Sequence, residues 1–286
     1  MDTQGDLVEE MKSYGMYQEG SVKEKFFLFW DKFILFFPSH IFTSSIQCTD
    51  ILKKVSPHSN PVYLPDGISI FSKEFQPEVV KKFRDTKGKE QAVDKLKLTP
   101  TDAESLKKWL KNKNQILLYT GSYSSGKGFP DFVKKCMPVL IKNYNLRFLF
   151  GGGDYNQIPQ LANLANSNPG RIISNSDLNS DNLLYFSVLG DIAFDCKPPE
   201  TSESSGKILN YMAAGLPVVC FNQKNNQNTL QEGGLTAKDY SGFTRNIVKL
   251  ANDQDLSKQM GDKNFERVWS EFTWDKTAQK IIETLA

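Results

Sequence analysis

The chain has 286 residues, which is enough for one large domain or two ordinary ones. Lys and Arg total 35 against 33 Asp and Glu, and a net charge of +2 gives no general reason to expect a nucleic-acid partner. A hydrophobic content of 39%, with aromatic residues at 12% of the chain, supports a packed core. Two His residues exclude a histidine-rich metal site, and we expect no bound metal.

The four cysteines, at positions 48, 136, 196 and 220, show no metal-ligand spacing. Three of them fall in apolar segments, where a cysteine is typically a buried thiol of a reducing compartment. Residues 1–20 are polar and acidic and carry no signal-peptide pattern. We therefore expect a cytoplasmic protein, with the inner face of the membrane as an alternative location.

In chain order, residues 2–17 are predicted to form a loop and a short helix, and residues 22–37 a second helix that is unusually aromatic. The second helix is shorter than the roughly 20 apolar residues of a membrane span. Three interpretations stay open: a core or interdomain helix, an interfacial membrane helix with lysines at the headgroups, or an interface to a missing domain. Its aromatic residues are Phe26, Phe27, Phe29, Trp30, Phe33, Phe36 and Phe37.

Residues 40–44 and 61–64 are predicted strands, separated by a helix over 45–54 for which Ser45 is a suitable N-cap. The second strand ends in Pro65-Asp66-Gly67, a turn signal. Residues 71–114 are charged and Lys-rich, with helical stretches near 77–83 and 102–110. We interpret 71–114 as a linker plus an insertion with a solvated face.

From residue 115 onward, short apolar strands alternate with helices, which predicts an α/β domain with a doubly wound parallel sheet. Apolar β-branched runs of this kind are typical of strands buried on both faces. The predicted strands are 115–120, 147–150, 171–174, 191–195 and 217–221. Helices are predicted over 158–165, 179–188, 242–251, 256–268 and 273–285, and after the loops at 121–128 and 202–206.

Three loops rich in Gly or Ser, 121–128, 151–154 and 202–206, follow strands of this sheet. Ligands of such sheets bind beyond the carboxyl ends of the strands. Lys127 follows a small-residue loop, and its ammonium is suited to reach a phosphate; the alternative is a solvent-facing lysine of the first helical turn. The Gly and Lys spacing differs from that of a Walker loop.

The stretch from Glu203 to Val219 runs from a small-residue loop into a short apolar helix that stops at Gly215. A helix N-terminus preceded by Ser and Gly, with Lys207 in the first turn, suits a diphosphate, although such a pattern is also typical of an ordinary cap. Because a first-turn lysine adds little to helix stability, Lys207→Ala is expected to leave the melting temperature nearly unchanged.

The same stretch, which ends in YMAAGLPVV, strongly resembles the nucleotide-sugar motif of the family-four-like retaining glycosyltransferases of GT-B fold, the glycosyl transferases group 1. The resemblance implies that Glu203 contacts the donor sugar, that the turn amides contact the diphosphate and that Asn210 holds the ribose. The spacing from Glu203 to Asn210 is one residue shorter than the usual pair of glutamates in that family, and Asn210 is neutral.

Other segments are similar to the same family. Lys127-Gly128 matches the Lys-Gly pair of its first phosphate loop, and Ser122 stands where that loop often has Arg. Glu232 matches a loop near the donor pocket of the family. Two roles stay open for Glu232: contact with the nucleotide, or the cap of a turn. The implied catalytic residues are Glu203, Lys127 and Lys207. The implied donor-binding residues are Gly121, Ser122, Ser125, Gly126, Gly152, Ser205, Gly206, Asn210 and Glu232.

The resemblance also predicts a domain organisation. Residues 1–70 would be a remnant of the N-terminal, acceptor-side domain, followed by the linker and insertion over 71–114. Residues 115–270 would form the Rossmann-like nucleotide-sugar-binding domain, and 271–286 a C-terminal helix that packs back across the cleft; Phe272-Thr273-Trp274 matches the family there.

The resemblance implies transfer of a sugar, with retention, from a nucleotide-diphosphate sugar to a glycan, lipid or small-molecule acceptor, in polysaccharide or glycoconjugate biosynthesis. The donor is a substrate, and no separate cofactor is expected. The N-terminal domain would be separately encoded, or the chain would self-associate. The alternatives are a non-catalytic nucleotide-sugar-binding or scaffold remnant that needs a partner chain, and a GT-B epimerase.

Overall fold

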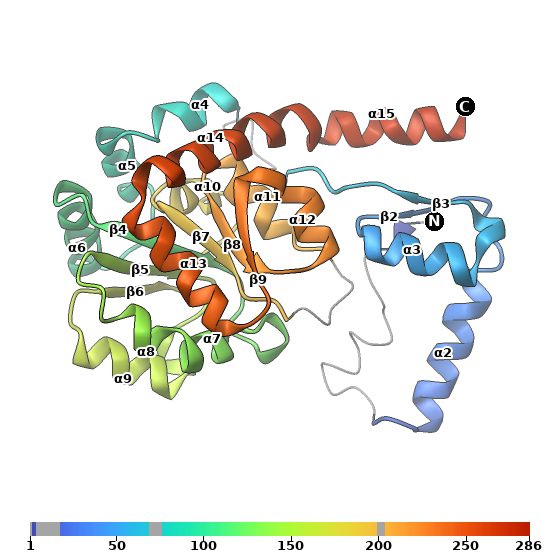
Figure 1. Ribbon diagram of the computed structural model, residues 1–286, viewed down its shortest axis with the longest axis horizontal. Helices are drawn as coiled ribbons and strands as arrows, with labels where there is room; N and C mark the ends of the chain where they lie inside the picture. The colour runs from blue at the N-terminus through green and yellow to red at the C-terminus, as the bar shows by residue number, and fades with distance from the viewer. Residues whose placement is uncertain (1, 4–17, 69–75, 199–203) are drawn as a thin grey trace. The chain divides into compact units, whose positions relative to one another are not determined.

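The computed structural model describes residues 2–3, 18–68, 76–198 and 204–286 (Figure 1). The chain divides into two compact units. Unit 1 comprises Met1–Gly67, Glu200–Ser205 and Trp274–Ala286, and unit 2 comprises Ile68–Pro199 and Gly206–Thr273. The short helix predicted over 2–17 falls almost wholly outside the described residues.

Unit 2 is built on a six-stranded sheet in which every described pairing is parallel, with the strand order β6-β5-β4-β7-β8-β9. The chain first adds strands on one side of β4 and then crosses over to add the remaining strands on the other side. This arrangement confirms the predicted doubly wound α/β fold. The strands are β4 (Gln115–Thr120), β5 (Leu146–Gly151), β6 (Ile172–Asn175), β7 (Ile192–Asp195), β8 (Val218–Phe221) and β9 (Gly234–Ala237).

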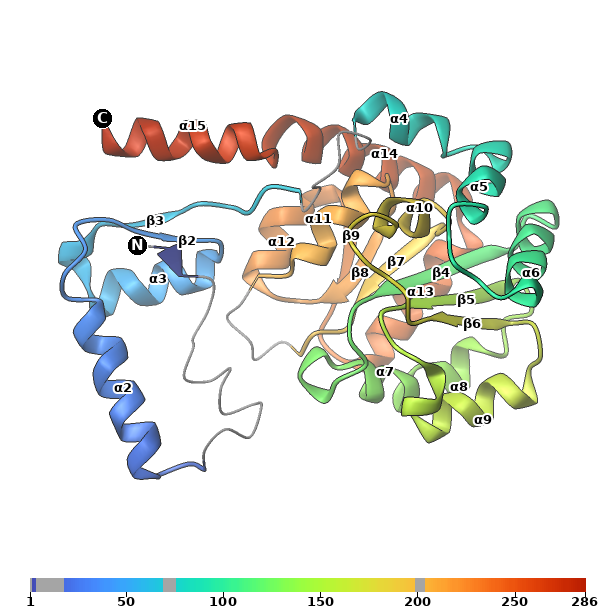
Figure 2. The ribbon, with the colours of Figure 1, turned by 180° about the vertical axis from the view of Figure 1, so that it is seen from behind.

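Both faces of this sheet are buried under helices. Successive residues of a strand point to opposite faces, so neighbouring strand residues belong to different apolar clusters. In β4, Ile116 and Leu118 belong to one apolar cluster, and Leu117 and Tyr119 belong to the other. The helices that contribute to the first cluster are α4 (Pro77–Lys82), α5 (Thr86–Val93), α6 (Pro100–Lys111), α10 (Leu183–Ser187), α11 (Gly206–Ala213), α12 (Lys224–Leu230) and α14 (Gln254–Glu271). Those that contribute to the second are α7 (Phe129–Lys135), α8 (Met137–Leu140), α9 (Pro159–Ser167) and α13 (Tyr240–Asn252) (Figure 2).

Local sequence explains where several of these helices begin. The side chains of Thr99, Asp239 and Asp253 accept hydrogen bonds from the amides of residue 102, 242 and 256, respectively, and so cap α6, α13 and α14. Such caps satisfy amide groups that have no partner inside the helix. Helix α12 connects β8 to β9 through a short 3₁₀ helix, η4 (Gln231–Gly233).

Residues 77–111 differ from the expectation of a solvated linker and insertion. They form α4, α5 and α6, and Val80, Ala92, Leu106 and Trp109 are buried in the first apolar cluster of unit 2. The high Lys content misled the prediction because lysines occupy the outer faces of amphipathic helices whose inner faces pack on a sheet. This segment is therefore a structural part of unit 2.

The contact between α11 and α14 leaves no room for a side chain at one position. A Cβ added to Gly261 of α14 would lie 2.2 Å from the carbonyl oxygen of Gly215, which follows α11. A backbone atom at that distance cannot move aside without shifting a whole segment. Helix α11 carries Lys207 and Asn210, two of the residues predicted for the site.

We expect Gly261→Ala to lower the free energy of unfolding by about 1–3 kcal/mol, through overpacking between α11 and α14. The control is Gly242→Ala in α13, where the nearest atom to an added Cβ is 3.4 Å away, so that the substitution should be neutral or mildly stabilising. Urea unfolding followed by circular dichroism measures both. Equal stability of the two variants would contradict the close packing.

Unit 1 contains a small parallel sheet with the order β1-β2-β3, formed by β1 (Asp2–Thr3), β2 (Ile41–Thr43) and β3 (Pro61–Tyr63). Helix α3 (Ile46–Val55) connects β2 to β3, and the Ser45 side chain accepts a hydrogen bond from the Cys48 amide, as predicted for its N-cap. A short 3₁₀ helix, η1 (Pro57–Ser59), precedes β3. Helix α15 (Trp274–Leu285) also belongs to this unit; Thr277 donates a hydrogen bond to the Pro65 carbonyl at 3.1 Å.

Helix α2 (Val22–Ile34), in unit 1, exposes most of its aromatic side chains. Phe26, Phe29, Trp30 and Phe33 are between 41% and 62% exposed, and Phe36 and Phe37 beyond the helix are about 70% exposed. Neighbouring rings contact one another along this face, for example Phe29 and Phe33 with centroids 5.9 Å apart. Over the described part of the chain, no helix combines the length and apolar character required to cross a bilayer.

We expect the triple substitution Phe29→Gln, Phe33→Gln and Phe36→Gln to leave the melting temperature nearly unchanged, because these side chains bury little area and Gln preserves helix propensity. The variant should bind less hydrophobic dye and elute earlier from a hydrophobic-interaction column. Phe132→Gln, at a fully buried position, should instead unfold the protein. Cooperative loss of structure in the triple variant would show that the aromatic face is part of a core.

Candidate functional site

The candidate site lies beyond the carboxyl ends of β4 and β7, at the point where the strand order reverses. In open parallel sheets this is where the connections leave toward opposite faces and where ligands bind. We call these strand ends and the loops that follow them the crevice. β4 pairs with β7 at Leu117–Ile192 and Leu118–Ala193. The amide of Thr120, farther along β4, instead donates a hydrogen bond of 2.8 Å to the hydroxyl of Tyr211.

Tyr211 fastens helix α11 to the end of β4. Its side chain is fully buried, and its hydroxyl lies 3.1 Å from Thr120 Oγ1 as well as 2.8 Å from the Thr120 amide. Burial raises the pKa of the Tyr211 phenol, so the hydroxyl stays neutral. If the buried Thr120 amide had no hydrogen-bond partner, the fold would lose about 1–3 kcal/mol of stability. The Tyr211 hydroxyl is therefore held at this amide, and the position of α11 relative to β4 is fixed with it. The first turn of α11, which contains Lys207, is held at the crevice as a result.

Lys207 is a mostly buried cation at this crevice. Its side chain is 15% exposed, and Nζ lies 3.3 Å from Oδ1 of Asp195, the last residue of β7, whose side chain is 1% exposed. The Asp195 carboxylate also accepts a hydrogen bond of 3.3 Å from the Lys197 amide. Two opposite charges can be buried together because each supplies part of the solvation that the other has lost.

Tyr119 connects Lys207 to the loop that follows β4. Its hydroxyl donates to the carbonyl oxygen of Ser122 at 3.1 Å and accepts from Lys207 Nζ at 3.4 Å. The Lys207 ammonium also lies 4.6 Å from the centroid of the Tyr119 ring. Burial, followed by the nearby Cys196 and Tyr211 side chains and the Asp195 carboxylate, raises the pKa of Tyr119, which therefore remains a neutral hydrogen-bond donor.

The glycine-rich loops at this edge pack against one another through backbone atoms. Gly152 has a φ of +98°, and a Cβ there would lie 2.7 Å from the Gly121 carbonyl oxygen. Gly128 has a φ of +73°, and its Cβ would lie 2.0 Å from the Cys196 carbonyl oxygen. The thiol of Cys196 donates to the Lys127 carbonyl, with the sulfur 3.4 Å from the oxygen. The loops after β4, β5 and β7 thus form one packed group.

Cys196 is a structural thiol in this group. Burial raises its pKa well above the ordinary value, although the charge of Lys207 acts in the opposite direction. A neutral buried thiol is inert as a nucleophile. All four cysteines are buried and free, which confirms the expectation for the three placed in apolar segments.

The structure brings several predicted site residues together. A Cβ at Gly121 would lie 3.3 Å from Lys207 Nζ, and the Tyr119 hydroxyl bonds both the Ser122 carbonyl and Lys207 Nζ. Ser125 and Gly126 lie in the exposed part of the same loop, before the half-buried Lys127. Gly206 begins α11, and an added Cβ there would meet no atom of the described residues within 4 Å.

Asn210, one turn after Gly206, has a buried polar atom that no described residue hydrogen-bonds. Its Oδ1 is buried, and it accepts no hydrogen bond from the residues that the structure describes. Ser205 belongs to unit 1, where the neighbouring Ser204 hydroxyl donates to Ser44 Oγ at 3.1 Å. Glu203, the predicted contact of the donor sugar, lies outside the described residues.

Glu232 is not part of this group of residues. It lies in η4, immediately before β9 and therefore at the amino edge of the parallel sheet, opposite the strand ends that hold the other residues. It is exposed and forms an ion pair with Lys263 of α14, whose hydrogen bond lowers the pKa of the Glu232 carboxyl. Between the two predicted roles, the position favours a surface contact at a turn over contact with a nucleotide.

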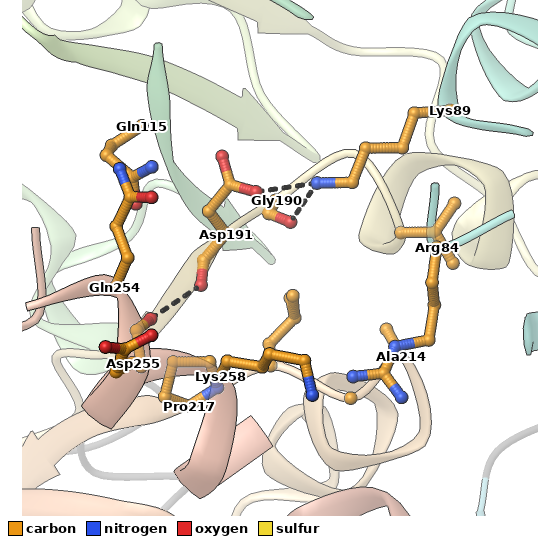
Figure 3. A pocket seen from close by; sticks show the side chains of 14 residues that line it. Arg84, Lys89, Gln115, Gly190, Asp191, Ala214, Pro217, Gln254, Asp255 and Lys258 are labelled. Atoms are coloured by element: carbon orange, nitrogen blue, oxygen red, sulfur yellow. Dashed lines mark hydrogen bonds and ion pairs between the residues drawn. The ribbon is translucent and has the colours of Figure 1, made fainter. Parts of the chain in front are cut away.

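A cavity of about 320 Å³ also lies at the amino edge of the sheet (Figure 3). Its lining includes Gln115, Asp191 and Pro217, which begin or directly precede β4, β7 and β8. Its basic side chains are already paired: Lys89 Nζ lies 2.7 Å from Asp191 Oδ1, and Arg84 and Lys258 both bond Asp262. The cavity is therefore separate from the crevice that contains Lys207.

Sequence reasoning missed Asp195, Tyr119 and Tyr211. Asp195 carried a signal, since it is a charged residue at the end of an otherwise apolar strand. Tyr119 and Tyr211 carried none, because an aromatic residue in an apolar run is ordinarily part of the core. Among the described residues, no cluster of His, Cys, Asp or Glu is arranged to hold a metal ion.

Comparison with known proteins agrees with this geometry. Residues 114–253, which contain the whole of the site described in unit 2, match the family of glycosyl transferases group 1. This matched segment includes helix α11, so the match agrees with the resemblance to the family's nucleotide-sugar motif.

The chain is similar to an uncharacterized glycosyltransferase of Haemophilus influenzae, with 28% identity over 191 residues that cover 62% of this chain and 49% of the relative. Its fold is similar to that of sucrose-phosphate synthase from Thermosynechococcus elongatus, with a TM-score of 0.69 and 18% identity over 99% of this chain and 65% of that one. It is also similar to Anabaena HepE in complex with UDP and glucose, with a TM-score of 0.59 and 14% identity over 86% of this chain and 62% of that one. The chain thus spans about half the length of the curated relative.

The burial of Lys207 changes the expected result of its substitution. Lys207→Met removes a counter-charge from a carboxylate that is 1% exposed, and we expect a loss of about 3 kcal/mol of stability instead of an unchanged melting temperature. The double variant Lys207→Met, Asp195→Asn removes both charges and should recover most of that loss. Thermal unfolding at neutral pH measures the series. Equal stability of the single and double variants would contradict a buried ion pair.

Proposed function

We propose that unit 2 binds the nucleoside diphosphate of a nucleotide-sugar donor, and that the chain supplies the donor-binding half of a retaining, metal-independent glycosyltransferase. The observation that carries the proposal is the position of Lys207 beside Gly121, where the strand order reverses. A cation and a helix N-terminus at that point form an environment that favours a phosphate group.

Two further observations support a nucleotide at this edge. The buried Oδ1 of Asn210 accepts no hydrogen bond from the described residues and suits a ribose hydroxyl as donor. Ser125, Gly126 and Gly206 leave open or exposed surface next to the two lysines, so that a ligand has access to backbone amides. The similar protein HepE binds UDP and glucose in its crystal structure, which supports a nucleotide-sugar donor for this chain as well.

In the proposed chemistry the acceptor forms a bond to the anomeric carbon of the sugar, the bond from that carbon to the diphosphate breaks, and the proton of the acceptor passes to the departing diphosphate or to solvent. When the sugar leaves the donor, negative charge develops on the diphosphate, and the ammonium groups of Lys207 and Lys127 stabilise it together with the amide groups at the start of α11. Glu203 would contact the sugar. The acceptor is a glycan, a lipid or a small molecule, and its binding requires surface outside unit 2.

The exposed aromatic face of α2 is consistent with further association. We propose that the active form includes a second polypeptide, a separately encoded domain or a second copy, packed on this face, with the membrane periphery as the alternative. Turnover by the isolated chain in its monomeric form, measured as transfer to an acceptor or hydrolysis of a nucleotide sugar while light scattering follows its mass, would show that no partner is needed. Donor binding without turnover would favour the non-catalytic binding module.

Calorimetry with UDP, GDP and ADP, and with the matching monophosphates, tests donor binding. We expect at least one diphosphate to bind more tightly than its monophosphate, and Lys127→Ala to weaken that binding about 10- to 100-fold, because a charge-assisted bond contributes about 1.5–3 kcal/mol. Lys134→Ala is the control, since Lys134 is exposed in the last turn of α7. Negligible affinity of the folded chain for every nucleotide would overturn the proposed function.

A further inference from the structure

Tyr119 occupies a position that the proposed donor chemistry does not use. Its hydroxyl is the junction between two segments that are far apart in sequence: the loop after β4, through the Ser122 carbonyl at 3.1 Å, and helix α11, through Lys207 Nζ at 3.4 Å. Its ring lies beneath the same ammonium at 4.6 Å. Both segments contain residues predicted to hold the diphosphate.

Tyr119 is itself firmly held. The side chain is fully buried, and its ring stacks on Phe129 with centroids 4.5 Å apart and planes inclined by 28°. The Phe194 ring of β7 lies 5.2 Å away on the same face of the sheet. A phenol in such surroundings presents its hydroxyl at one place, because the ring cannot move without disrupting the core.

Lys207, by contrast, has a long and flexible side chain that needs external contacts to point in one direction. A lysine ammonium is a compact charge with three donors on a stem of four methylenes, and its orientation is not fixed by its own geometry. Here Asp195 Oδ1 at 3.3 Å, the Tyr119 hydroxyl and the Tyr119 ring restrict it together. A side chain that is ordered before the ligand arrives loses less entropy when it binds.

We propose that Tyr119 is a positioning residue that sets the Lys207 ammonium and the Ser122 loop in one arrangement for a nucleoside diphosphate. This inference rests on the proposed function of the same site. Tyr119 acts through Lys207, whose ammonium its hydroxyl holds next to the Ser122 loop, and it does not touch the ligand itself. Its contribution should therefore disappear when Lys207 loses its ammonium, and it should affect a diphosphate more than a monophosphate.

The experiment is a double-mutant cycle on the whole chain, with binding of UDP and UMP measured by calorimetry. GDP or ADP replaces UDP if that diphosphate binds more tightly. Tyr119→Phe removes the hydroxyl and keeps the ring, and it should weaken diphosphate binding about three- to tenfold with little change for the monophosphate. Lys207→Met should weaken diphosphate binding further, and the double variant should bind no more weakly than Lys207→Met alone. If Lys207→Met does not fold, the cycle is performed in the Asp195→Asn background.

Tyr123→Phe provides the matched control. Tyr123 belongs to the same ring stack, but its hydroxyl pairs with Ser174 Oγ at 2.7 Å. Its effect on affinity should add to that of Lys207→Met without coupling. Unchanged affinity in Tyr119→Phe, or additive effects of Tyr119→Phe and Lys207→Met, would overturn the positioning role while leaving the proposed function intact. Failure of the wild-type chain to bind any diphosphate would overturn both.

Discussion

The hydrogen bond between the Tyr211 hydroxyl and the Thr120 amide is the contact on which the arrangement of the site depends. Pairing between β4 and β7 is made at Leu117 and Leu118, and a parallel sheet that reverses its order there leaves strand-end amides to be satisfied by other groups. Tyr211 provides that group from α11. The bond that satisfies the backbone therefore also determines where α11 begins, and with it the place of Lys207.

The charge at the crevice follows from that placement. Once α11 is fixed, Lys207 is mostly removed from water, and a lone buried ammonium would be costly. Asp195, at the end of β7, supplies the compensating charge, so the site has a cation without a large net charge. Electrostatic stabilisation of a leaving diphosphate requires such preorganised groups, because their orientation is established during folding rather than during the reaction.

The sequence was sufficient to predict most of the fold. Strand β4 occurs at the predicted residues, and alternating apolar strands and helices over 115–285 predicted the doubly wound sheet. The helical stretches predicted near 77–83 and 102–110 occur as α4 and α6, but the Lys-rich composition did not indicate that these helices pack on the sheet. Within the site, the motif correctly placed Lys207 and Asn210 on one helix, α11. Their burial could not be predicted from the local sequence, because it depends on distant neighbours such as Asp195 of β7. The sequence left two roles open for Glu232, because sequence proximity to a strand does not say which edge of the sheet a loop occupies; the structure places Glu232 before β9, at the amino edge.

The glycines of the candidate site illustrate the same distinction between motif and geometry. Gly128 and Gly152 have positive φ angles and touch backbone of neighbouring loops, so their small size is already required by folding. An added Cβ at Gly126 or Gly206 would meet no described atom within 4 Å, so packing among the described residues does not require glycine there. A Gly-rich pattern therefore combines two kinds of position that sequence alone cannot separate: glycines that let the loops pack together, and glycines at which the described residues leave the backbone accessible. Only the second kind is available for the backbone contacts to a diphosphate that we propose.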